Sequence, residues 1–384
     1  MATHTSNHLL EIKKYGQSIW MDYLTRDIIL SGELEELIEN KGISGVTSNP
    51  TIFEKAIIGN EIYDKDIEAG VRNHKTIQQV YESLIFADIR NACDILCAIY
   101  ESSKALDGYV SIEVPPTISQ DTQRTIEEAR RYYQQINRSN VMVKIPGTKA
   151  GFPAIEQATR EGINVNVTLL FSVNNYAEAA WAYIRGLEAR VADGQDISNI
   201  SSVASFFLSR IDSKVDALID EKFKKGVPDQ PSEVKLTLIR GKVAIANAKM
   251  AYQKYKEIIA SERWQALANK GANPQRLLWA STSTKDPTYS KVKYVEELVG
   301  SDTVTTLAPK TIELCAEHCK VTNSIETDVD KARNLIASFR DPDIDINLDQ
   351  VMDELLVEGI DQFIKSFQSL MQSLEEKIKR LAPV

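Results

Sequence analysis

Short apolar runs alternate with longer segments of helical periodicity along the chain. The runs have the length of β-strands and cover residues 18–22, 45–50, 109–114, 141–147, 164–171, 200–207, 277–281 and 303–307. Between them, apolar residues recur at spacings of three and four, which predicts helices at 32–40, 77–103, 123–135, 174–191, 210–224, 233–259 and 289–298. Strands that alternate with helices form parallel sheets with crossover connections. Eight such repeats predict an α/β fold of the closed TIM (β/α)8 barrel type.

The intervals between strand ends predict one barrel domain over residues 1–384, with added helices. Lys144 and Thr168 are 24 residues apart, which is the length expected of one βα unit. The interval from residue 47 to residue 113 spans 66 residues, and the interval from 205 to 281 spans 76. These two intervals are too long for one crossover helix, so we expect extra helices in both.

The chain from about residue 320 to residue 384 is expected to form a helical C-terminal extension. Its last part places apolar residues on one stripe of an amphipathic helix. The stripe consists of Leu356, Ile360, Phe363, Phe367, Leu370 and Leu374. We interpret this helix as packed on the outside of the barrel, with a lid over the barrel mouth as the alternative.

The charge balance limits the classes of partner. The chain has 54 Asp and Glu residues and 45 Lys and Arg residues, for a formal net charge of −9, which argues against nucleic-acid binding through bulk positive charge. An anionic substrate stays open, because a few local cations suffice to bind one phosphate group. No run of about 20 apolar residues is present, and residues 1–10 lack the basic start and apolar core of a secretory signal. We therefore expect a cytoplasmic protein without a membrane partner, as a monomer or a homodimer.

Polar residues stand at the ends of the predicted strands. They are Asp22, Asn49, Glu113, Lys144, Thr168 and Ser205. In a (β/α)8 barrel the carboxyl ends of the strands form the active site. A polar side chain that points into the barrel costs free energy unless it is paired, so several of them together predict a site.

Lys144 lies within the apolar run 141–145, which is typical of a strand buried on both faces. Burial disfavours the ammonium form and makes the neutral amine available to attack a carbonyl and form a Schiff base. The alternative is a lysine that extends to solvent at a strand end or forms a structural ion pair with Glu113. Glu113 on the preceding strand and Thr168 on the following strand favour chemistry, because a carboxylate and a hydroxyl beside the amine could hold a water that moves protons.

Asp22, Asn49 and Asn166 are further candidates. Aspartate after a strand is a common helix cap, but Asp22 could also take a proton from a substrate hydroxyl during carbon–carbon cleavage. Asn49 precedes Pro50, and asparagine before proline is often only a turn residue. Asn166 stands two residues before Thr168 and therefore shares its face of the strand.

Two segments are candidates for binding a phosphate group. Ser205 and Arg210 flank a predicted strand-to-helix turn, where backbone N–H groups and the helix dipole favour an anion. Arg210 supplies a forked donor, although a single arginine is usually a solvated surface residue. Ser281 and Lys285 bound a segment rich in hydroxyl side chains, and Lys285 could add a second cation. That segment is equally compatible with a plain loop.

Five strings resemble motifs of the transaldolase family and fall in the expected order. They are GVTSNPTIFEKAI (45–57), SIEV (111–114), VMVKIPGTKAG (141–151), NVNVTLLFS (164–172) and ASFFLSRID (204–212). Together they span most of the predicted barrel, so the joint match is highly specific. The similarity is strongest to the longer bacterial and plant-type branch, whose extra helical insertion corresponds to about residues 221–275.

The resemblance implies a transferase of the non-oxidative pentose phosphate pathway, in carbohydrate metabolism. It would move a dihydroxyacetone unit from sedoheptulose 7-phosphate to glyceraldehyde 3-phosphate, which gives erythrose 4-phosphate and fructose 6-phosphate. Sugar phosphates are thus the implied partners. No cofactor or metal is implied, because the iminium nitrogen of a lysine Schiff base serves as the electron sink.

The matching motifs imply a role for each candidate in the chemistry. Lys144 would form the Schiff base. Glu113 and Thr168 would position the catalytic water. Asp22 would be the acid and base for the hydroxyl at the cleaved bond, although little motif surrounds it and its assignment follows strand position.

The remaining candidates would bind the substrate. The resemblance implies that Asn49 and Asn166 orient the dihydroxyacetone moiety and that Ser205 and Arg210 hold the phosphate group. Shorter members of the family place an arginine soon after the seventh strand. Here the nearest cation is Lys285, which weakens its assignment to the phosphate group.

Other interpretations stay open. One is a class I aldolase of the fructose-6-phosphate type, which would release the dihydroxyacetone unit to water instead of to an acceptor sugar. Another is an inactive barrel used for binding or assembly. The four cysteines are too few for a disulfide scaffold, and their spacing of four is typical of buried small side chains on helices. A zinc site or a redox-switch disulfide is the alternative for Cys93, Cys97, Cys315 and Cys319.

Overall fold

Eight parallel strands close into a barrel in the computed structural model, which describes residues 7–226 and 229–381. Each strand pairs with the next along the chain, and the last pairs with the first. The strands are β1 (Gln17–Asp22), β2 (Ile43–Thr47), β3 (Tyr109–Glu113), β4 (Val141–Pro146), β5 (Val165–Leu170), β6 (Ser202–Phe207), β7 (Arg276–Ala280) and β8 (Thr303–Leu307). The expected (β/α)8 barrel is thereby confirmed.

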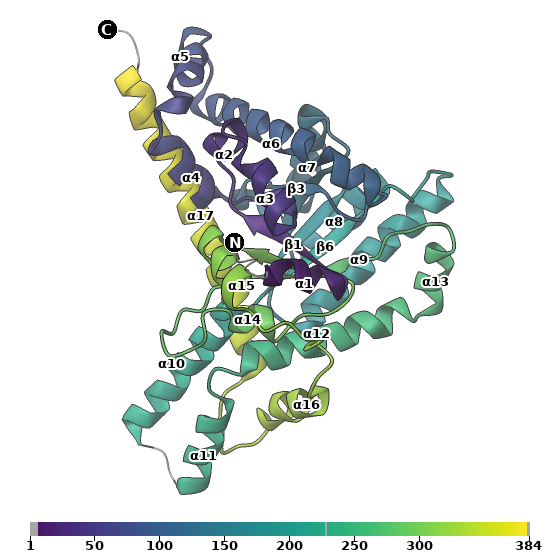
Figure 1. The fold of residues 1–384 in the computed structure, drawn as a ribbon, viewed down its shortest axis with the longest axis vertical. Helices are drawn as coiled ribbons and strands as arrows, with labels where there is room; N and C mark the ends of the chain where they lie inside the picture. The colour runs from purple at the N-terminus through teal and green to yellow at the C-terminus, as the bar shows by residue number, and fades with distance from the viewer. Residues whose placement is uncertain (1–6, 227–228, 382–384) are drawn as a thin grey trace, which may run out of the picture.

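Helices surround the barrel (Figure 1). Those before β6 are α1 (His8–Lys14), α2 (Arg26–Leu30), α3 (Glu33–Lys41), α4 (Pro50–Ile58), α5 (Asp64–Arg72), α6 (Ile77–Ser102), α7 (Thr122–Ile136), α8 (Gly151–Arg160) and α9 (Val173–Ala192). Those after β6 are α10 (Ser209–Lys225), α11 (Gln230–Ile239), α12 (Val243–Ile259), α13 (Glu262–Ala268), α14 (Lys293–Glu296), α15 (Pro309–His318), α16 (Val329–Ser338) and α17 (Leu348–Leu381). Two short 3-10 helices, η1 (Glu61–Tyr63) and η2 (Pro116–Ile118), complete the described elements.

Local chemistry explains why the elements begin where they do. Almost every strand residue is buried, as the continuous apolar runs predict for strands covered on both faces. Polar side chains at the helix N-caps accept hydrogen bonds from backbone N–H groups that the helix leaves unpaired. Asn49 does this for α4, Thr76 for α6 through a full capping box, and Ser172 for α9.

Two of the predicted helices differ from the structure. The segment 233–259 is broken into α11 and α12, because Gly241 takes a left-handed backbone with φ of +64°. A Cβ atom at Gly241 would lie 2.5 Å from the ring of Tyr289, so the break brings two segments into close contact. The second predicted helix, 289–298, is reduced to the single turn of α14.

The C-terminal helix α17 lies across the mouth of the barrel, where the strands end. It contacts α10, which follows β6, and α4, which follows β2 on the opposite side of the barrel, and it also contacts β5 and η2. Figure 1 shows α17, in yellow, beside α4. The interpretation of α17 as a helix on the outside of the barrel is therefore wrong, and the alternative, a cover over the mouth, describes its position.

Polar contacts hold α17 in this position from both ends. Near its C-terminus, the Nζ atom of Lys377 donates to the backbone oxygens of Ile57 and Asn60 at 2.9 and 2.6 Å and pairs with Asp64 at 2.7 Å. A cation at this place also suits the negative end of the α4 dipole. Near its N-terminal end, Lys214 of α10 pairs with two glutamates of the helix.

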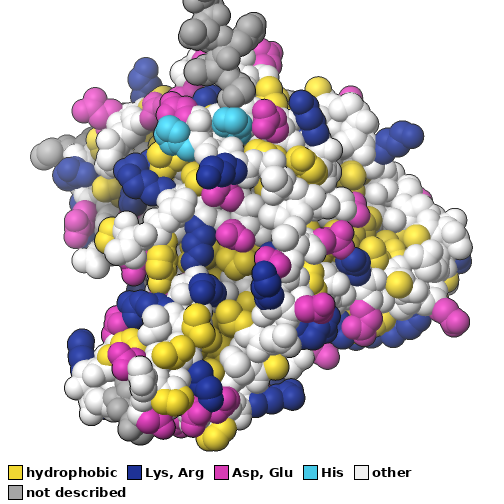
Figure 2. All heavy atoms as spheres, turned by 60° about the horizontal axis from the view of Figure 1, so that its bottom comes forward, with side chains coloured by type: hydrophobic (Ala, Val, Ile, Leu, Met, Phe, Trp, Pro, Cys, Tyr) yellow, Lys and Arg dark blue, Asp and Glu magenta, His cyan; other side chains and the backbone are white. Residues whose placement is uncertain are grey.

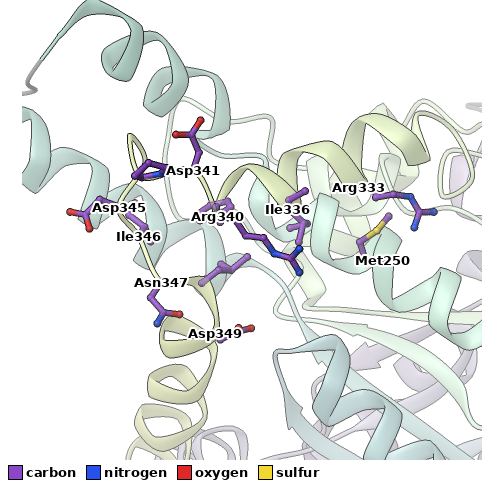
Figure 3. A pocket seen from close by; sticks show the side chains of 13 residues that line it. Met250, Arg333, Ile336, Arg340, Asp341, Asp345, Ile346, Asn347 and Asp349 are labelled. Carbon is purple, nitrogen blue, oxygen red and sulfur yellow. The ribbon is translucent and has the colours of Figure 1, made fainter.

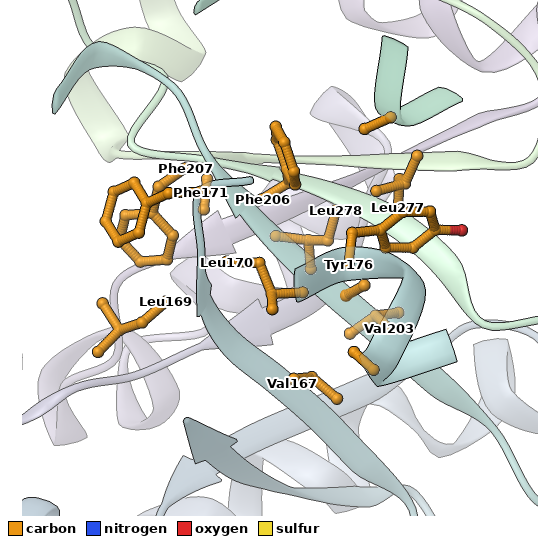
Figure 4. Close-up of a cluster of buried hydrophobic side chains, with 14 of the residues drawn as sticks. Val167, Leu169, Leu170, Phe171, Tyr176, Val203, Phe206, Phe207, Leu277 and Leu278 are labelled. Carbon is orange, nitrogen blue, oxygen red and sulfur yellow. The ribbon is translucent and has the colours of Figure 1, made fainter. Parts of the chain in front are cut away.

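Apolar side chains fill the space between the strands and the helices. Figure 4 shows one part of this core, where residues of β5, β6 and β7 meet Tyr176 of α9. The end of the barrel away from α17 is closed by a polar network. There Arg276 donates to Ser18 at 2.7 Å, and Ser18 and Trp20 donate to Asp107.

Figure 2 turns the lower part of Figure 1 toward the viewer. On the face that it shows, positive and negative side chains are interspersed. Among residues 7–226 and 229–381, none of the helices combines the length and the apolar character that crossing a membrane requires.

Candidate active site

A cavity of about 120 Å³ lies at the carboxyl ends of the strands, beneath α17. Most of the residues that the sequence singles out line it. They are Asp22, Asn49, Lys144, Thr168, Ser205, Arg210 and Ser281. Side chains that the sequence did not single out as site residues complete the lining: Thr47, Phe207, Leu278, Ala280, Thr306 and Phe363.

Lys144 is buried at the base of this cavity. Its side chain is 6% exposed, and its Nζ atom donates to the backbone oxygen of Ser48 at 3.3 Å. The same atom lies 3.6 Å from Oε2 of Glu113, which is close enough for an ion pair but long for a hydrogen bond. Lys144 therefore does not extend to solvent, and its amine faces the cavity with part of its hydrogen-bonding capacity free.

Strand register explains why Glu113 and Asn166 flank Lys144. Glu113 of β3 pairs with Lys144 of β4, and Lys144 pairs in turn with Asn166 of β5. Residues at one level of neighbouring parallel strands point to the same side. The three polar side chains thus form one layer across the barrel.

Glu113 and Thr168 carry buried polar atoms without a partner. Neither carboxylate oxygen of Glu113 nor the hydroxyl oxygen of Thr168 has a hydrogen bond to any described residue. Buried polar groups are nearly always paired, so these atoms mark a place built for a hydroxyl or a water. Burial raises the pKa of Glu113 from 4.5 to about 7, with the charge of Lys144 acting in the opposite direction. A carboxyl group with that pKa can both donate and accept a proton near neutral pH.

Asp22 is oriented by two threonines. Thr47 donates its hydroxyl proton to Oδ1 of Asp22 at 2.7 Å, and the hydroxyl of Thr306 lies 3.1 Å from that of Thr47. Both threonines stand near the ends of their strands and were missed in the sequence. The rule that picked out Asp22, a polar residue where a strand ends, would also have found them.

The two asparagines occupy different depths. Asn49 caps α4 through its side-chain oxygen, at 3.1 Å from the backbone nitrogen of Ile52, which leaves its NH2 group available to a ligand. Asn166 lies deeper and donates to the hydroxyl of Ser111 at 3.0 Å. The hydroxyl of Ser205 donates to the side-chain oxygen of Asn166 at 2.7 Å, so Ser205 fixes the orientation of that amide.

Arg210 connects the cavity to an outer groove of about 570 Å³, which runs between α10, α17 and the segment after β7. The groove is lined by Ser281 and Lys285 as well as by Arg210. Within the described residues, the half-buried guanidinium group of Arg210 makes no hydrogen bond and no ion pair, and it packs 5.4 Å from the ring centroid of Phe207. Burial lowers its pKa, with Glu358 acting in the opposite direction. A partly desolvated cation without a partner is suited to bind an anion.

The backbone is strained at two positions beside these residues. Leu169, next to Thr168, has φ of +59° at a bulge in β5, and Ser281 has φ of +56° just after β7. A left-handed backbone conformation is rare for residues other than glycine, and such residues are concentrated at functional sites. The bulge directs Leu169 toward α17, where its side chain comes within 2.9 Å of the Cβ position at Gly359.

Phe363 of α17 forms the outer wall of the cavity. Its ring centroid lies 6.0 Å from Nζ of Lys144, and the residue is 7% exposed. The sequence placed Phe363 on an apolar stripe but gave no signal that the stripe meets the strand ends.

A larger cavity of about 680 Å³ lies elsewhere, between α16 and the start of α17. Figure 3 shows its lining, including Arg340 and Asp349. None of the candidate residues lines it, so size alone does not identify the site.

The cysteines lie on α6, on α15 and just after α15, and none of them lines the cavity. All four are free thiols in the structure. Among residues 7–226 and 229–381, no group of three or more His, Cys, Asp or Glu side chains is placed to hold a metal ion. The zinc alternative therefore finds no ligand set in this part of the chain.

Comparison with known proteins agrees with this geometry. A family model described as Transaldolase/Fructose-6-phosphate aldolase matches residues 19–374. The chain belongs to this family. It is 68% identical to Transaldolase 2 of Nostoc punctiforme, over 99% of this chain and 100% of the relative. It is 63% identical to Transaldolase of Trichodesmium erythraeum, again over 99% of this chain and 100% of the relative.

A more distant relative shows that the similarity extends along the whole chain. Transaldolase of Thiobacillus denitrificans is 42% identical over 95% of this chain and 98% of that protein. The resemblance expected from the five sequence motifs is thus confirmed. Membership of the family covers both the barrel and α17, because the family model ends within that helix.

Proposed function

We propose that this chain acts as a transaldolase through a Schiff base on Lys144. It would transfer a dihydroxyacetone unit from sedoheptulose 7-phosphate to glyceraldehyde 3-phosphate, in the non-oxidative pentose phosphate pathway. The observation that carries the proposal is the buried amine of Lys144, which faces the cavity 3.6 Å from Glu113. Full-length relatives named transaldolase support it.

The first stage joins the substrate to the enzyme. The neutral amine of Lys144 adds to the ketone carbon and loses one proton, and the former carbonyl oxygen takes up two protons and leaves as water, which gives an iminium ion. Glu113 can supply and remove these protons, because its pKa is raised to about 7. The unpartnered hydroxyl of Thr168 is suited to hold the water with Glu113.

The second stage breaks and remakes the carbon–carbon bond. Asp22 takes the proton of the substrate hydroxyl next to the bond, the bond breaks, and its electrons pass to the iminium nitrogen. The aldose leaves, and an enamine remains on Lys144. The enamine then attacks the aldehyde carbon of the acceptor, Asp22 returns its proton, and water hydrolyses the new iminium ion to release the product.

The other side chains would bind the substrate. Asn49 and Asn166 would orient the dihydroxyacetone moiety. Arg210 and Ser281 would hold the phosphate group, with Lys285 as an outer cation of the same groove. Ser205 donates to Asn166, so we assign it to orienting that amide in addition to the phosphate role that the motif implies.

Transfer is favoured over simple aldol cleavage. Both reactions end with hydrolysis of an iminium ion, but an aldolase must first protonate the enamine carbon. Here Phe363 covers the cavity above Lys144 and limits the access of bulk water to that carbon. The relatives at 63–68% identity also carry the name transaldolase. We infer a cytoplasmic location from the free cysteines, which are typical of reducing compartments. A monomer or a homodimer remains the prediction for the assembly, and sedimentation velocity tests it.

Trapping of the intermediate tests the proposal. The enzyme is incubated with fructose 6-phosphate and borohydride, which reduces an iminium ion to a stable amine, and the adduct is located by peptide mass spectrometry. We expect the adduct on Lys144. A parallel assay with erythrose 4-phosphate should produce sedoheptulose 7-phosphate. Without an acceptor, the release of glyceraldehyde 3-phosphate should stop after about one molecule per enzyme molecule. Continuous release would establish the aldolase instead.

A further inference from the structure

We propose that Glu358 of α17 competes with the phosphate group of the substrate for the cations of the outer groove, and that Lys214 is the cation they share. This inference rests on the proposed function in one respect, because it takes the ligand of the groove to be a phosphate group. It assigns a role in substrate affinity to two residues that the catalytic steps above do not use.

Lys214 and Arg210 are neighbours in the groove. They stand four residues apart on α10, so their side chains extend from one face of the helix, and both line the groove with Lys285. The Nζ atom of Lys214 lies 2.5 Å from Oε1 of Glu358 and 2.8 Å from Oε2 of Glu354. Burial lowers the pKa of Lys214, but its hydrogen bonds to these two carboxylates raise it above the ordinary value.

Close packing of α17 brings Glu358 to the same place. The next residue, Gly359, is buried, and a Cβ atom there would lie 3.6 Å from Nη1 of Arg210 and 2.9 Å from the side chain of Leu169. Glycine inside a helix costs about 1 kcal/mol relative to alanine. Its presence here allows the helix backbone to approach the barrel, and Glu358 is thereby held in the groove beside Lys214.

The charges of the groove imply competition. Among the described residues that line the groove, Glu358 carries the one carboxylate. The cations of the same lining are Arg210, Lys214 and Lys285. A phosphate dianion seated on Arg210 would meet the negative charge of Glu358, and like charges at this range repel. Lys214 cannot keep its close contact with Glu358 and also turn fully to the phosphate group. The affinity for phosphate is therefore lower than the three cations alone would give.

Binding of inorganic phosphate, measured by calorimetry on the intact chain, tests the inference. We expect Glu358→Gln to bind phosphate more tightly, by roughly threefold to tenfold, because it removes the competing charge and keeps the shape. Lys214→Met should bind phosphate more weakly by a similar factor. Lys214→Arg keeps the charge and should stay within about twofold of the wild type.

A second ion pair on α10 provides the matched control. Lys222 pairs with Asp345 at 2.8 Å, and neither residue lines the groove. Asp345→Asn removes the same charge as Glu358→Gln and should leave phosphate affinity within about twofold of the wild type. Arg210→Ala should abolish the binding, which shows that the measured site is the groove.

The outcomes separate this inference from the proposed function. Phosphate binding to Glu358→Gln that is no tighter than to the wild type would overturn the competition. Unchanged binding to Lys214→Met would remove Lys214 from the groove's function, and absence of binding to the wild type would overturn the inference as a whole. The Schiff base is tested independently, because borohydride trapping of dihydroxyacetone on Lys144 requires no phosphate group.

Discussion

The Nζ atom of Lys144 lies 3.6 Å from Oε2 of Glu113, and the two side chains are 6% and 3% exposed. Removing one partner of a buried ion pair usually destabilises a protein, because the other charge is left buried without a partner. The intact pair nevertheless contributes little net stability, because burying both charges costs desolvation free energy. Here neither oxygen of the carboxylate has a hydrogen bond within the described residues. The arrangement is poorly satisfied as a structural ion pair, but it suits a pair that exchanges protons with a bound substrate.

Replacement of Lys144 tests the nucleophile directly. Lys144→Met keeps most of the side-chain volume and removes the amine, so no iminium ion can form. We expect turnover to fall by at least about a thousandfold, and the borohydride adduct to disappear. Lys149→Met is the control, because Lys149 follows β4 closely and is exposed. Activity near the wild-type level in Lys144→Met would show that another group forms the intermediate.

Glu113→Gln separates proton transfer from binding. The amide keeps the shape of the carboxyl group but cannot exchange protons in the same way, so kcat should fall by about a hundredfold with little change in KM. Steady-state kinetics with sedoheptulose 7-phosphate measure both constants. A change confined to KM would contradict the assignment of Glu113 to proton transfer.

The raised pKa of Glu113 also predicts how stability depends on pH. Between pH 4.5, the ordinary pKa, and about 7, the folded protein keeps this proton while the unfolded chain loses it. The free energy of unfolding should therefore decrease as the pH rises through this window, by up to about 3 kcal/mol from this group. Urea denaturation at pH 5 and pH 8 measures the effect, and Glu113→Gln should show a smaller decrease. Equal pH dependence in both proteins would rule out the shift.

The sequence predicted the inner part of the site because strand geometry is local and regular. Asp22, Glu113, Lys144 and Thr168 each stand near the end of an apolar run, and parallel strands in register bring such positions to one end of the barrel. Asn166 joined this group because it shares the strand face of Thr168, and the family motifs implied its role in orienting the substrate. All of these residues lie in or directly beside the cavity.

The cover of the site could not be predicted in this way. Phe363 and Glu358 reach it only because α17 crosses the mouth, and the periodicity of an amphipathic helix gives its apolar face but not the surface that this face meets. The break at Gly241 was missed for a related reason, since the contact with Tyr289 that accompanies it is distant in the sequence. Contacts between elements far apart along the chain determined each of these features.

Arg210→Ala should separate the phosphate group from the rest of the substrate. The half-buried guanidinium group has no hydrogen bond or ion pair to lose within the described residues, so the cost should fall mainly on binding. For phosphorylated substrates, kcat/KM should fall by an amount that corresponds to about 2–4 kcal/mol of lost transition-state stabilisation, which is the expectation for a bidentate contact. Trapping of unphosphorylated dihydroxyacetone on Lys144 should be almost unchanged and serves as the internal control. An unaltered KM for sugar phosphates would remove Arg210 from the site.

Phe363→Ala tests whether α17 keeps water from the intermediate. The ring stands 6.0 Å from Nζ of Lys144 and forms a wall of the cavity, so its removal should admit solvent to the enamine and iminium ion. We expect release of free dihydroxyacetone from fructose 6-phosphate without an acceptor to rise several-fold relative to transfer. Phe367→Ala is the matched control, because Phe367 lies one turn further along α17 and packs against Tyr81, 5.9 Å away between ring centroids. An equal rise in both variants would point to general loosening of the helix, and no rise in Phe363→Ala would mean that the ring does not determine whether the dihydroxyacetone unit passes to water or to a sugar.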